Sequence, residues 1–324
     1  MEEERILWTV GGMSFSPYAG FIAAGVLLGI VVFLIRGRKE KAGALALTVL
    51  LAVPLGLLGA RAFYVLARFD EFAAEFGFDS FFRARNPEYA IWGAANGAGL
   101  WGAVGGAALG ALLAGKCTGT KVSRLLDAMA PAGALGIVLS RLGEFSIGEG
   151  IGPTVTEEAF AFFPLAVINE WEEWNYAVFL LESLTALILF CFLLRRDDRW
   201  RDGDRARAFL LIYSACQIVL EALRRDNFLR WLFVRVSQVT AAVVLLGLLV
   251  FGILRWARRP ANKRISRRSV VTCCTVFVLL AGVVVLLEFG IDKSAELSIP
   301  LAYLLEAGCA AGMGAAVWRV AMRS

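Results

Sequence analysis

The amino-acid sequence predicts an all-α, polytopic integral membrane protein, and three observations support this fold class. Hydrophobic residues make up 59% of the 324 residues, and the mean hydropathy is +0.68, which is above the range of soluble globular domains. Several windows exceed the roughly 18 apolar residues that are needed to cross a bilayer. These windows are continuously apolar and lack the alternation of a membrane β-barrel, so each must form a helix.

Nine membrane-spanning helices are expected. The expected spans are residues 17–35, 43–67, 91–115, 126–145, 175–194, 208–225, 235–256, 269–290 and 299–318. The first seven spans form one predicted domain, residues 1–256, with an outside head segment at residues 146–174. A basic cytoplasmic linker, residues 257–268, then leads to a two-helix membrane extension, residues 269–324.

The positive charges of the connecting loops predict the orientation. If the N-terminus lies outside, the inside loops hold most of the 33 Lys and Arg residues, which is the bias expected of cytoplasmic loops. We therefore expect an outside N-terminus and a cytoplasmic C-terminus, and the formal charge of +5 reflects sidedness rather than nucleic-acid binding. The start of the chain lacks the basic residues and cleavage site of a signal peptide, so the first helix should remain in the mature protein.

Cysteine and histidine usage restricts the chemistry. The six cysteines show no spacing typical of a disulfide framework or a zinc site. Histidine is absent, which removes His-based acid–base catalysis and the commonest metal ligand. Any chemistry must therefore use Glu, Asp, Arg, Tyr or a thiol of the substrate.

The segment Asp127–Gly152 carries the strongest functional signal. It begins as an apolar helix, places Arg141 and Glu144 three residues apart near its end, and continues into the turn Gly148-Glu149-Gly150-Ile151-Gly152. An ionised arginine on a membrane helix needs an anionic partner or substrate, which indicates function. Arg141 could bind a lipid phosphate bidentately, or it could form an internal ion pair with Glu144 one helical turn away.

Polar residues on two further helices are also candidates. Gln217, Glu221 and Arg224 share one stripe of the span at 208–225 because of their spacing. Arg61 lies about two turns inside the outer boundary of its span, a depth at which a charge is expected to be paired. The expected partner of Arg61 is one of the glutamates Glu144, Glu149 and Glu221.

These residues resemble the signature elements of the bacterial prolipoprotein diacylglyceryl transferases over about residues 1–256. That family has an Asp-x-x-(Ala)-Pro opening followed by Arg-x-Gly-Asn-Phe-x-Asn-Gly-Glu-x-x-Gly. The matching positions are Asp127, Pro131, Arg141, Gly143, Phe145, Gly148, Glu149 and Gly152. Further matches are Arg61 and Tyr64 on the second helix, Glu221 and Arg224 on the sixth, and Tyr18 near the start of the first.

The sequence departs from the family pattern inside this site. Glu144 and Ile147 stand where the family has asparagines, Trp101 replaces a histidine, and Gln217 replaces an arginine. The changes at positions 101 and 217 each remove a possible cation. Arg225, Arg230 and Arg235, at the outside end of the same hairpin, could compensate, or they could extend to the lipid headgroups. Glu144 should partly neutralise Arg141 and weaken phosphate binding. Alternatively, a desolvated Glu144 could serve as the base that the missing histidine cannot supply.

The resemblance implies a multi-pass enzyme of the bacterial plasma membrane. Its substrates would be phosphatidylglycerol, or a similar anionic phospholipid, and a prolipoprotein, whose signal peptide carries a lipobox cysteine that receives the diacylglyceryl group. The resemblance implies catalytic roles for Arg141, Glu149 and Glu221, and the desolvation argument adds Glu144. The implied lipid- or phosphate-binding residues are Arg61, Arg141, Arg224, Tyr18 and Gly152. No metal, organic cofactor or nucleic acid is implied. Two alternatives stay open, namely a non-catalytic relative that binds phospholipid or lipoprotein signal peptides, and a membrane transporter or scaffold.

Overall fold

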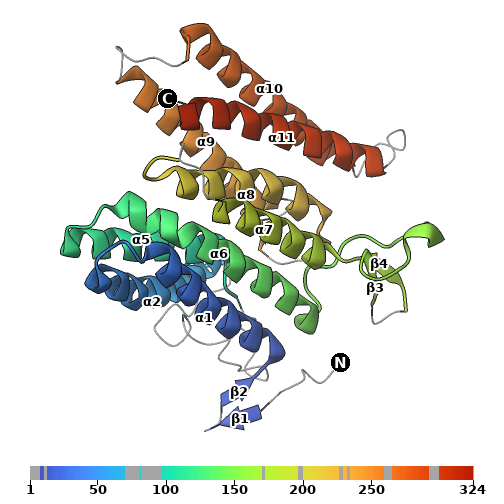
Figure 1. Ribbon diagram of the computed structural model, residues 1–324. Coiled ribbons are helices and arrows are strands. Elements are labelled where there is room, and N and C mark those ends of the chain that lie inside the picture. Colours follow the sequence, from blue (N-terminus) through green and yellow to red (C-terminus); the bar gives the residue numbers. More distant parts are fainter. Residues whose placement is uncertain are drawn as a thin grey trace. The chain divides into compact units, whose positions relative to one another are not determined.

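The computed structural model describes residues 8–10, 13–69, 81, 97–169, 172–195, 200–225, 229–231, 234–258, 265–291 and 299–323. The α-helices in these ranges are α1 (Pro17–Gly37), α2 (Ala42–Ala67), α5 (Leu100–Thr118), α6 (Val122–Glu144), α7 (Val178–Leu194), α8 (Asp204–Leu223), α9 (Val236–Ala257), α10 (Arg267–Ile291) and α11 (Ile299–Arg323) (Figure 1). Eight of them are long and apolar enough to cross a bilayer, and α7 is a shorter apolar helix of 17 residues. The predicted all-α, polytopic membrane fold is therefore confirmed.

Short strands and 3-10 turns lie between the helices. Strands β1 (Trp8–Val10) and β2 (Met13–Phe15) form an antiparallel pair, and so do β3 (Ala166–Ile168) and β4 (Trp174–Tyr176). The remaining short elements are β5 (Arg230–Trp231), β6 (Val234–Arg235) and the 3-10 turns Phe145–Ile147 and Glu158–Phe160.

Two helices begin later than their hydropathy predicts. Helix α7 begins at Val178 rather than near residue 175, because β4 includes Asn175, whose amide donates to the Gly152 carbonyl oxygen at 3.3 Å. Helix α5 begins at Leu100 rather than residue 91. Gly97 has a φ of 117°, a left-handed conformation that an α-helix cannot include. Residues 91–96 lie outside the described residues.

The chain divides into two compact units, and the first comprises residues 1–203 and 225–233. In this unit α2 packs against α5, while α1 and α7 both pack against α6 (Figure 1). The contact between α2 and α5 depends on glycine. A Cβ atom built on Gly102 would lie 2.1 Å from the carbonyl oxygen of Gly59, so the two backbones could not approach as they do with any larger residue.

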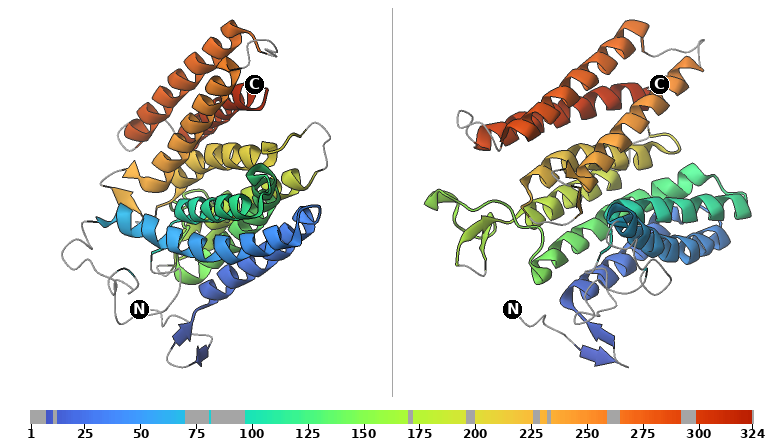
Figure 2. Two further views of the ribbon diagram at one scale, coloured as in Figure 1. Left: turned by 90° about the vertical axis from the view of Figure 1, so that its left-hand side faces the viewer. Right: turned by 180° about the vertical axis from the view of Figure 1, so that it is seen from behind.

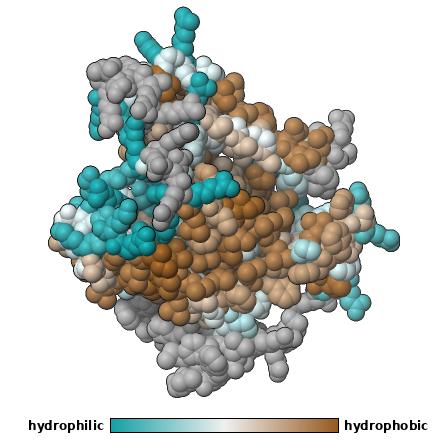
Figure 3. All heavy atoms as spheres, in the orientation of Figure 1, coloured by the Kyte–Doolittle hydropathy of each residue, from teal (hydrophilic) through white to brown (hydrophobic). Residues whose placement is uncertain are grey.

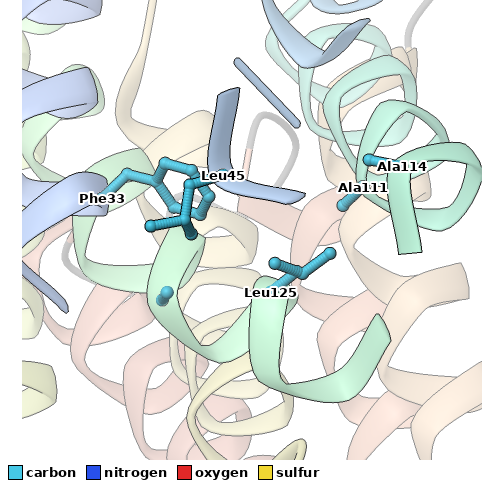
Figure 4. Close-up of a cluster of buried hydrophobic side chains, with 6 residues drawn as sticks. Phe33, Leu45, Ala111, Ala114 and Leu125 are labelled. Carbon is cyan, nitrogen blue, oxygen red and sulfur yellow. The ribbon is translucent and has the colours of Figure 1, made fainter. Parts of the chain in front are cut away.

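A small hydrophobic core closes the first unit at the helix ends that are predicted to face the cytoplasm. Phe33 of α1 and Leu45 of α2 meet Leu125 of α6, with Ala111 and Ala114 of α5 beside them (Figure 4). Leu125 and both alanines have no exposed surface. The small side chains on α5 thus leave room for the three large side chains, so that α1, α2, α5 and α6 can pack together.

Polar contacts lie next to this core. Arg124 on α6 pairs with Asp202 at 3.1 Å and with Glu40 at 3.6 Å. Partial burial opposes the charge of Asp202, but hydrogen bonds from Arg124 and Lys121 outweigh it and hold the pKa of that carboxyl below its usual value. Asp127 accepts from the Gly203 amide at 2.6 Å, which is the kind of structural contact expected of an acid at the inside boundary.

The second unit comprises residues 204–224 and 234–324 and contains α8 to α11. Helix α11 packs against α8, α9 and α10, and α8 also packs against α9 (Figure 2). Helices α9 and α11 approach closely at Gly252, where an added Cβ atom would lie 2.8 Å from the Cα atom of Ala321.

Large aliphatic side chains are exposed on helices of both units. They include Leu50, Leu66, Leu286 and Leu304, which are 68%, 68%, 72% and 69% exposed. Apolar side chains likewise dominate much of the face seen in Figure 3. Hydrocarbon chains are as apolar as leucine, so this surface suits a lipid bilayer.

Candidate functional site

The last turn of α6 holds a buried cluster of charged side chains. Arg141 and Glu144 are 8% and 4% exposed, and their side chains form an ion pair. Glu182 on α7 is 2% exposed, and its Oε2 atom lies 3.3 Å from the Nε atom of Arg141. We call Arg141, Glu144 and Glu182 the Arg141 cluster. One guanidinium thus pairs with two carboxyl groups, an arrangement whose charged form carries a net negative charge.

Sequence reasoning anticipated one of these two partners. The internal ion pair with Glu144, which was the alternative to phosphate binding, is present. Glu182 was missed, although it is the only charged residue within α7. A lone acid on an apolar helix is a signal of function or pairing, and it would have pointed to this position.

The turn from Gly148 to Gly152 is fixed against this cluster by its backbone. The Glu149 amide donates to the Glu144 carbonyl oxygen at 3.1 Å, and the Gly150 carbonyl oxygen accepts from the Phe179 amide at 2.8 Å. Gly150 has a φ of 72°, and an added Cβ atom would lie 2.7 Å from Oε2 of Glu144. Only glycine therefore satisfies both the backbone conformation and the space beside the carboxylate. Glu149, which lies in this turn beside the cluster, is half-buried.

Gly152 and Tyr18 complete the surroundings of the cluster. The Gly152 amide donates to the Tyr176 carbonyl oxygen at 2.8 Å, which joins the turn to β4. Tyr18, at the start of α1, is 8% exposed, and its hydroxyl hydrogen-bonds with Ser140 and interacts electrostatically with Glu144. Tyr18 therefore lies beside the Arg141 cluster, and its role in lipid binding stays a prediction.

Arg61 makes a different set of contacts. Its Nε atom donates to the Phe81 carbonyl oxygen at 2.6 Å, and its Nη1 atom donates to the Gly97 carbonyl oxygen at 3.1 Å. The guanidinium also lies over the ring of Tyr64, 5.5 Å from the centroid. These contacts join α2 to Phe81 and Gly97. The expectation of an acidic partner for Arg61 stays a prediction.

The second unit contains another buried polar cluster, on α8 and at the start of α9. Gln217 is 1% exposed and donates from Nε2 to Oε1 of Glu221 at 2.9 Å. Arg235 lies 3.7 Å from Oε2 of Glu221, and it also donates to the main-chain oxygen of Arg224. We call Gln217, Glu221, Arg224 and Arg235 the α8 cluster. It holds two guanidinium groups and one carboxylate.

The α8 cluster contains an arginine that can compensate for the one that Gln217 replaces. Arg235 is 5% exposed, so it does not extend to the lipid headgroups as the snorkelling alternative predicted. It contributes a second cation to the stripe formed by Gln217 and Glu221. Sequence reasoning named Arg235 only as one of three arginines that might compensate, because it is distant from Glu221 along the chain.

Metal binding finds no support in the part of the chain that the structure describes. No group of three or more Cys, Asp or Glu side chains is placed there to hold a metal ion.

The helices and the buried charged clusters together define a polytopic membrane protein with ionisable groups in its interior. The family model for prolipoprotein diacylglyceryl transferase matches residues 5–256, so the chain belongs to that family. It is a multi-pass bacterial membrane protein.

Similar proteins carry the corresponding name. The chain is 28% identical over 269 residues to the phosphatidylglycerol–prolipoprotein diacylglyceryl transferase of Shouchella clausii, covering 79% of this chain and 92% of that protein. It is 29% identical over 273 residues to the Bacillus cereus protein of the same name, covering 81% and 96%. The similarly named Frankia alni protein is 32% identical over 267 residues, covering 79% and 67%.

Proposed function

We propose that this chain is a phosphatidylglycerol–prolipoprotein diacylglyceryl transferase of the bacterial plasma membrane. In the reaction, a base removes the proton of the lipobox cysteine thiol, and the thiolate sulfur attacks the glyceryl carbon that carries the phosphate. A thioether C–S bond forms, the C–O bond to the phosphate breaks, and glycerol phosphate leaves. The chemistry needs a base near the thiol and a cationic group for the departing phosphate.

The Arg141 cluster is the observation that carries this proposal. Its two carboxyl groups share a single cation, so the cluster can accept one proton and still keep an ion pair with Arg141. Glu144 suits this role because its Oε2 atom lies beside Gly150, next to the turn that presents Glu149. Binding of a phosphate by Arg141 would require an exchange with one of these carboxylates, since both now occupy its donors.

The α8 cluster supports the second requirement by itself. Arg224 and Arg235 exceed the single carboxylate of Glu221, and a guanidinium stays charged and binds phosphate oxygens bidentately. We assign the α8 cluster to phosphate binding. We assign the Arg141 cluster to thiol activation, with Glu149 and Gly152 shaping its turn and Tyr18 orienting Glu144.

The test measures product directly. Purified protein is incubated with phosphatidylglycerol and a lipobox peptide, and the thioether-linked peptide is detected by its mass. We expect product with the natural sequence and a loss of about 10²-fold or more with Glu144→Gln, which removes the proposed base while keeping the shape of the side chain. Glu157→Gln, in the exposed part of the head segment, is the matched control and should leave the rate unchanged.

Two outcomes would contradict the assignment. Unchanged turnover in Glu144→Gln would show that Glu144 is not the base. If the natural sequence bound phosphatidylglycerol without forming product, the non-catalytic relative would be favoured instead. The departures from the family pattern at Trp101, Glu144 and Gln217 are the reason for considering that alternative.

A further inference from the structure

Two acidic residues of the second unit are not explained by the transferase reaction. Glu288 lies on α10 and Glu306 on α11, both beyond the residues 5–256 that match the family. Glu306 is the eighth residue of α11, which places it about 10 Å along a helix that is long and apolar enough to span the membrane. Ionisable groups at such positions are costly and are retained for a function.

Glu306 is buried, with an exposed fraction of 0%. Among the residues that the structure describes, no donor group gives a hydrogen bond to either of its carboxyl oxygens. The polar side chain in hydrogen-bonding contact with it is another carboxyl, that of Glu288. If both groups were ionised, neither would have a hydrogen to donate and two like charges would face each other in a medium of low dielectric constant.

Gln238 on α9 determines which of the two acids holds its charge better. Its side-chain amide has two hydrogens. One is donated to the Ile218 carbonyl oxygen on α8 at 3.1 Å, and the other to Oε1 of Glu288. Glu288 therefore has a donor that favours its ionised form, whereas the proton of the pair belongs on Glu306, where it can be donated to Glu288.

Titratable and charged groups on the neighbouring elements have partners of their own. The Tyr303 hydroxyl on α11 donates to the Ala222 carbonyl oxygen at 3.4 Å. Glu221 on α8 is paired with Arg235, which directly precedes α9. Cys309, one turn from Glu306 on α11, is buried and is in electrostatic contact with Glu306.

We propose that Glu288 and Glu306 form a proton-binding site that holds the α10–α11 hairpin against α8 and α9. The bound proton converts a repulsive contact between two carboxylates into a hydrogen bond that connects α11 to α10. The amide of Gln238 continues this connection to α9 and α8. When the proton leaves, the negative charges repel each other and the contact between these helices weakens.

The first test is the infrared spectrum of the purified protein in lipid nanodiscs at neutral pH, because a protonated carboxyl absorbs at a different frequency from a carboxylate. We expect a band from a protonated carboxyl that Glu306→Gln removes. Glu157→Gln, in the exposed head segment, should leave the band unchanged. Absence of the band from the natural protein, or its persistence in Glu306→Gln, would overturn the proposal.

The second test is the melting temperature as a function of pH. The folded state holds the proton and the unfolded state releases it near neutral pH, so the stabilisation is present at low pH and is lost as the pH rises. The melting temperature of the natural protein should fall progressively as the pH rises, until the folded pair has also lost its proton. Glu306→Gln, which keeps a hydrogen-bond donor and has no proton to lose, should fold and lose this dependence.

A third arm distinguishes a proton from a metal cation as the ligand. Melting is measured at fixed alkaline pH in sodium chloride and in choline chloride. Equal melting temperatures would support the proton-binding site. A rise in sodium that Glu306→Gln abolishes would overturn the proposal in favour of a cation site. None of these readouts depends on diacylglyceryl transfer, so they succeed or fail separately from the proposed enzyme activity.

Discussion

The two acidic partners of Arg141 are brought to it in different ways. Glu144 comes from the same helix one turn along, so α6 alone brings it to the guanidinium. Glu182 comes from α7 and depends on the packing of the two helices. The neighbouring Ser183 donates to the Val138 carbonyl oxygen at 3.1 Å, which fixes the register of α7 on α6. The ion pair to Glu182 is therefore a product of tertiary structure.

This asymmetry predicts the order of stabilities of two variants. Arg141→Ala leaves two buried carboxylates without their shared cation, and we expect a loss of about 3–5 kcal/mol in the free energy of unfolding. Glu182→Ala leaves Arg141 with Glu144, and we expect a smaller loss of about 1.5–3 kcal/mol, the range for a hydrogen bond to a charged group. Chemical unfolding of the purified proteins in detergent measures both. Equal losses, or a larger loss in Glu182→Ala, would show that Glu182 and not Glu144 carries the pairing with Arg141.

At the scale of the element, the pair of α2 and α5 shows how composition sets the distance between helices. Glycines on α5 face backbone atoms of α2 along several turns, and Gly106, like Gly102, leaves no room for a side chain. Without a hydrophobic driving force between helices in lipid, such close backbone contact is a main source of association.

A matched pair of substitutions on α5 tests this contact. Gly102→Ala places a methyl group against the Gly59 carbonyl oxygen, and we expect a loss of about 1–3 kcal/mol because the helices must separate. Gly105→Ala adds the same methyl group at a position with nothing within 4 Å, so it should leave stability unchanged or slightly increase it. Thermal unfolding of both variants in detergent gives the comparison. A neutral Gly102→Ala would mean that α2 and α5 are not in close contact.

The same elements show how far the sequence could lead. Hydropathy predicted the helices, because a long apolar segment has few alternatives in a membrane. The sequence did not predict the later start of α7, because that start depends on the hydrogen bond of Asn175 with a distant turn. The sequence likewise shows Arg141 near the end of an apolar span and Glu182 as a lone acid on another. It does not show that the two form a pair, since apolar periodicity says little about which helices become neighbours.

At the scale of the whole molecule, the distribution of positive charge predicts sidedness. Loops that the sequence places inside hold most of the Lys and Arg residues, whereas residues 146–174 contain neither. The cluster of Arg124, Lys121 and Asp202 lies on the side of the first unit that this bias assigns to the cytoplasm. The orientation, with an outside N-terminus and a cytoplasmic C-terminus, stays a prediction that a cysteine can test.

Cys117 is suited to this test because it is exposed in the last turn of α5, at the end predicted to lie inside. In a variant that keeps Cys117 alone, a membrane-impermeant maleimide should label permeabilised cells and leave intact cells unlabelled. The control is a cysteine-free variant carrying Thr156→Cys, an exposed position in the head segment, which should be labelled in intact cells. The reverse pattern, with Cys117 labelled and residue 156 protected in intact cells, would invert the orientation and move the Arg141 cluster to the cytoplasmic side. A lipobox cysteine that has crossed the membrane could not reach it there.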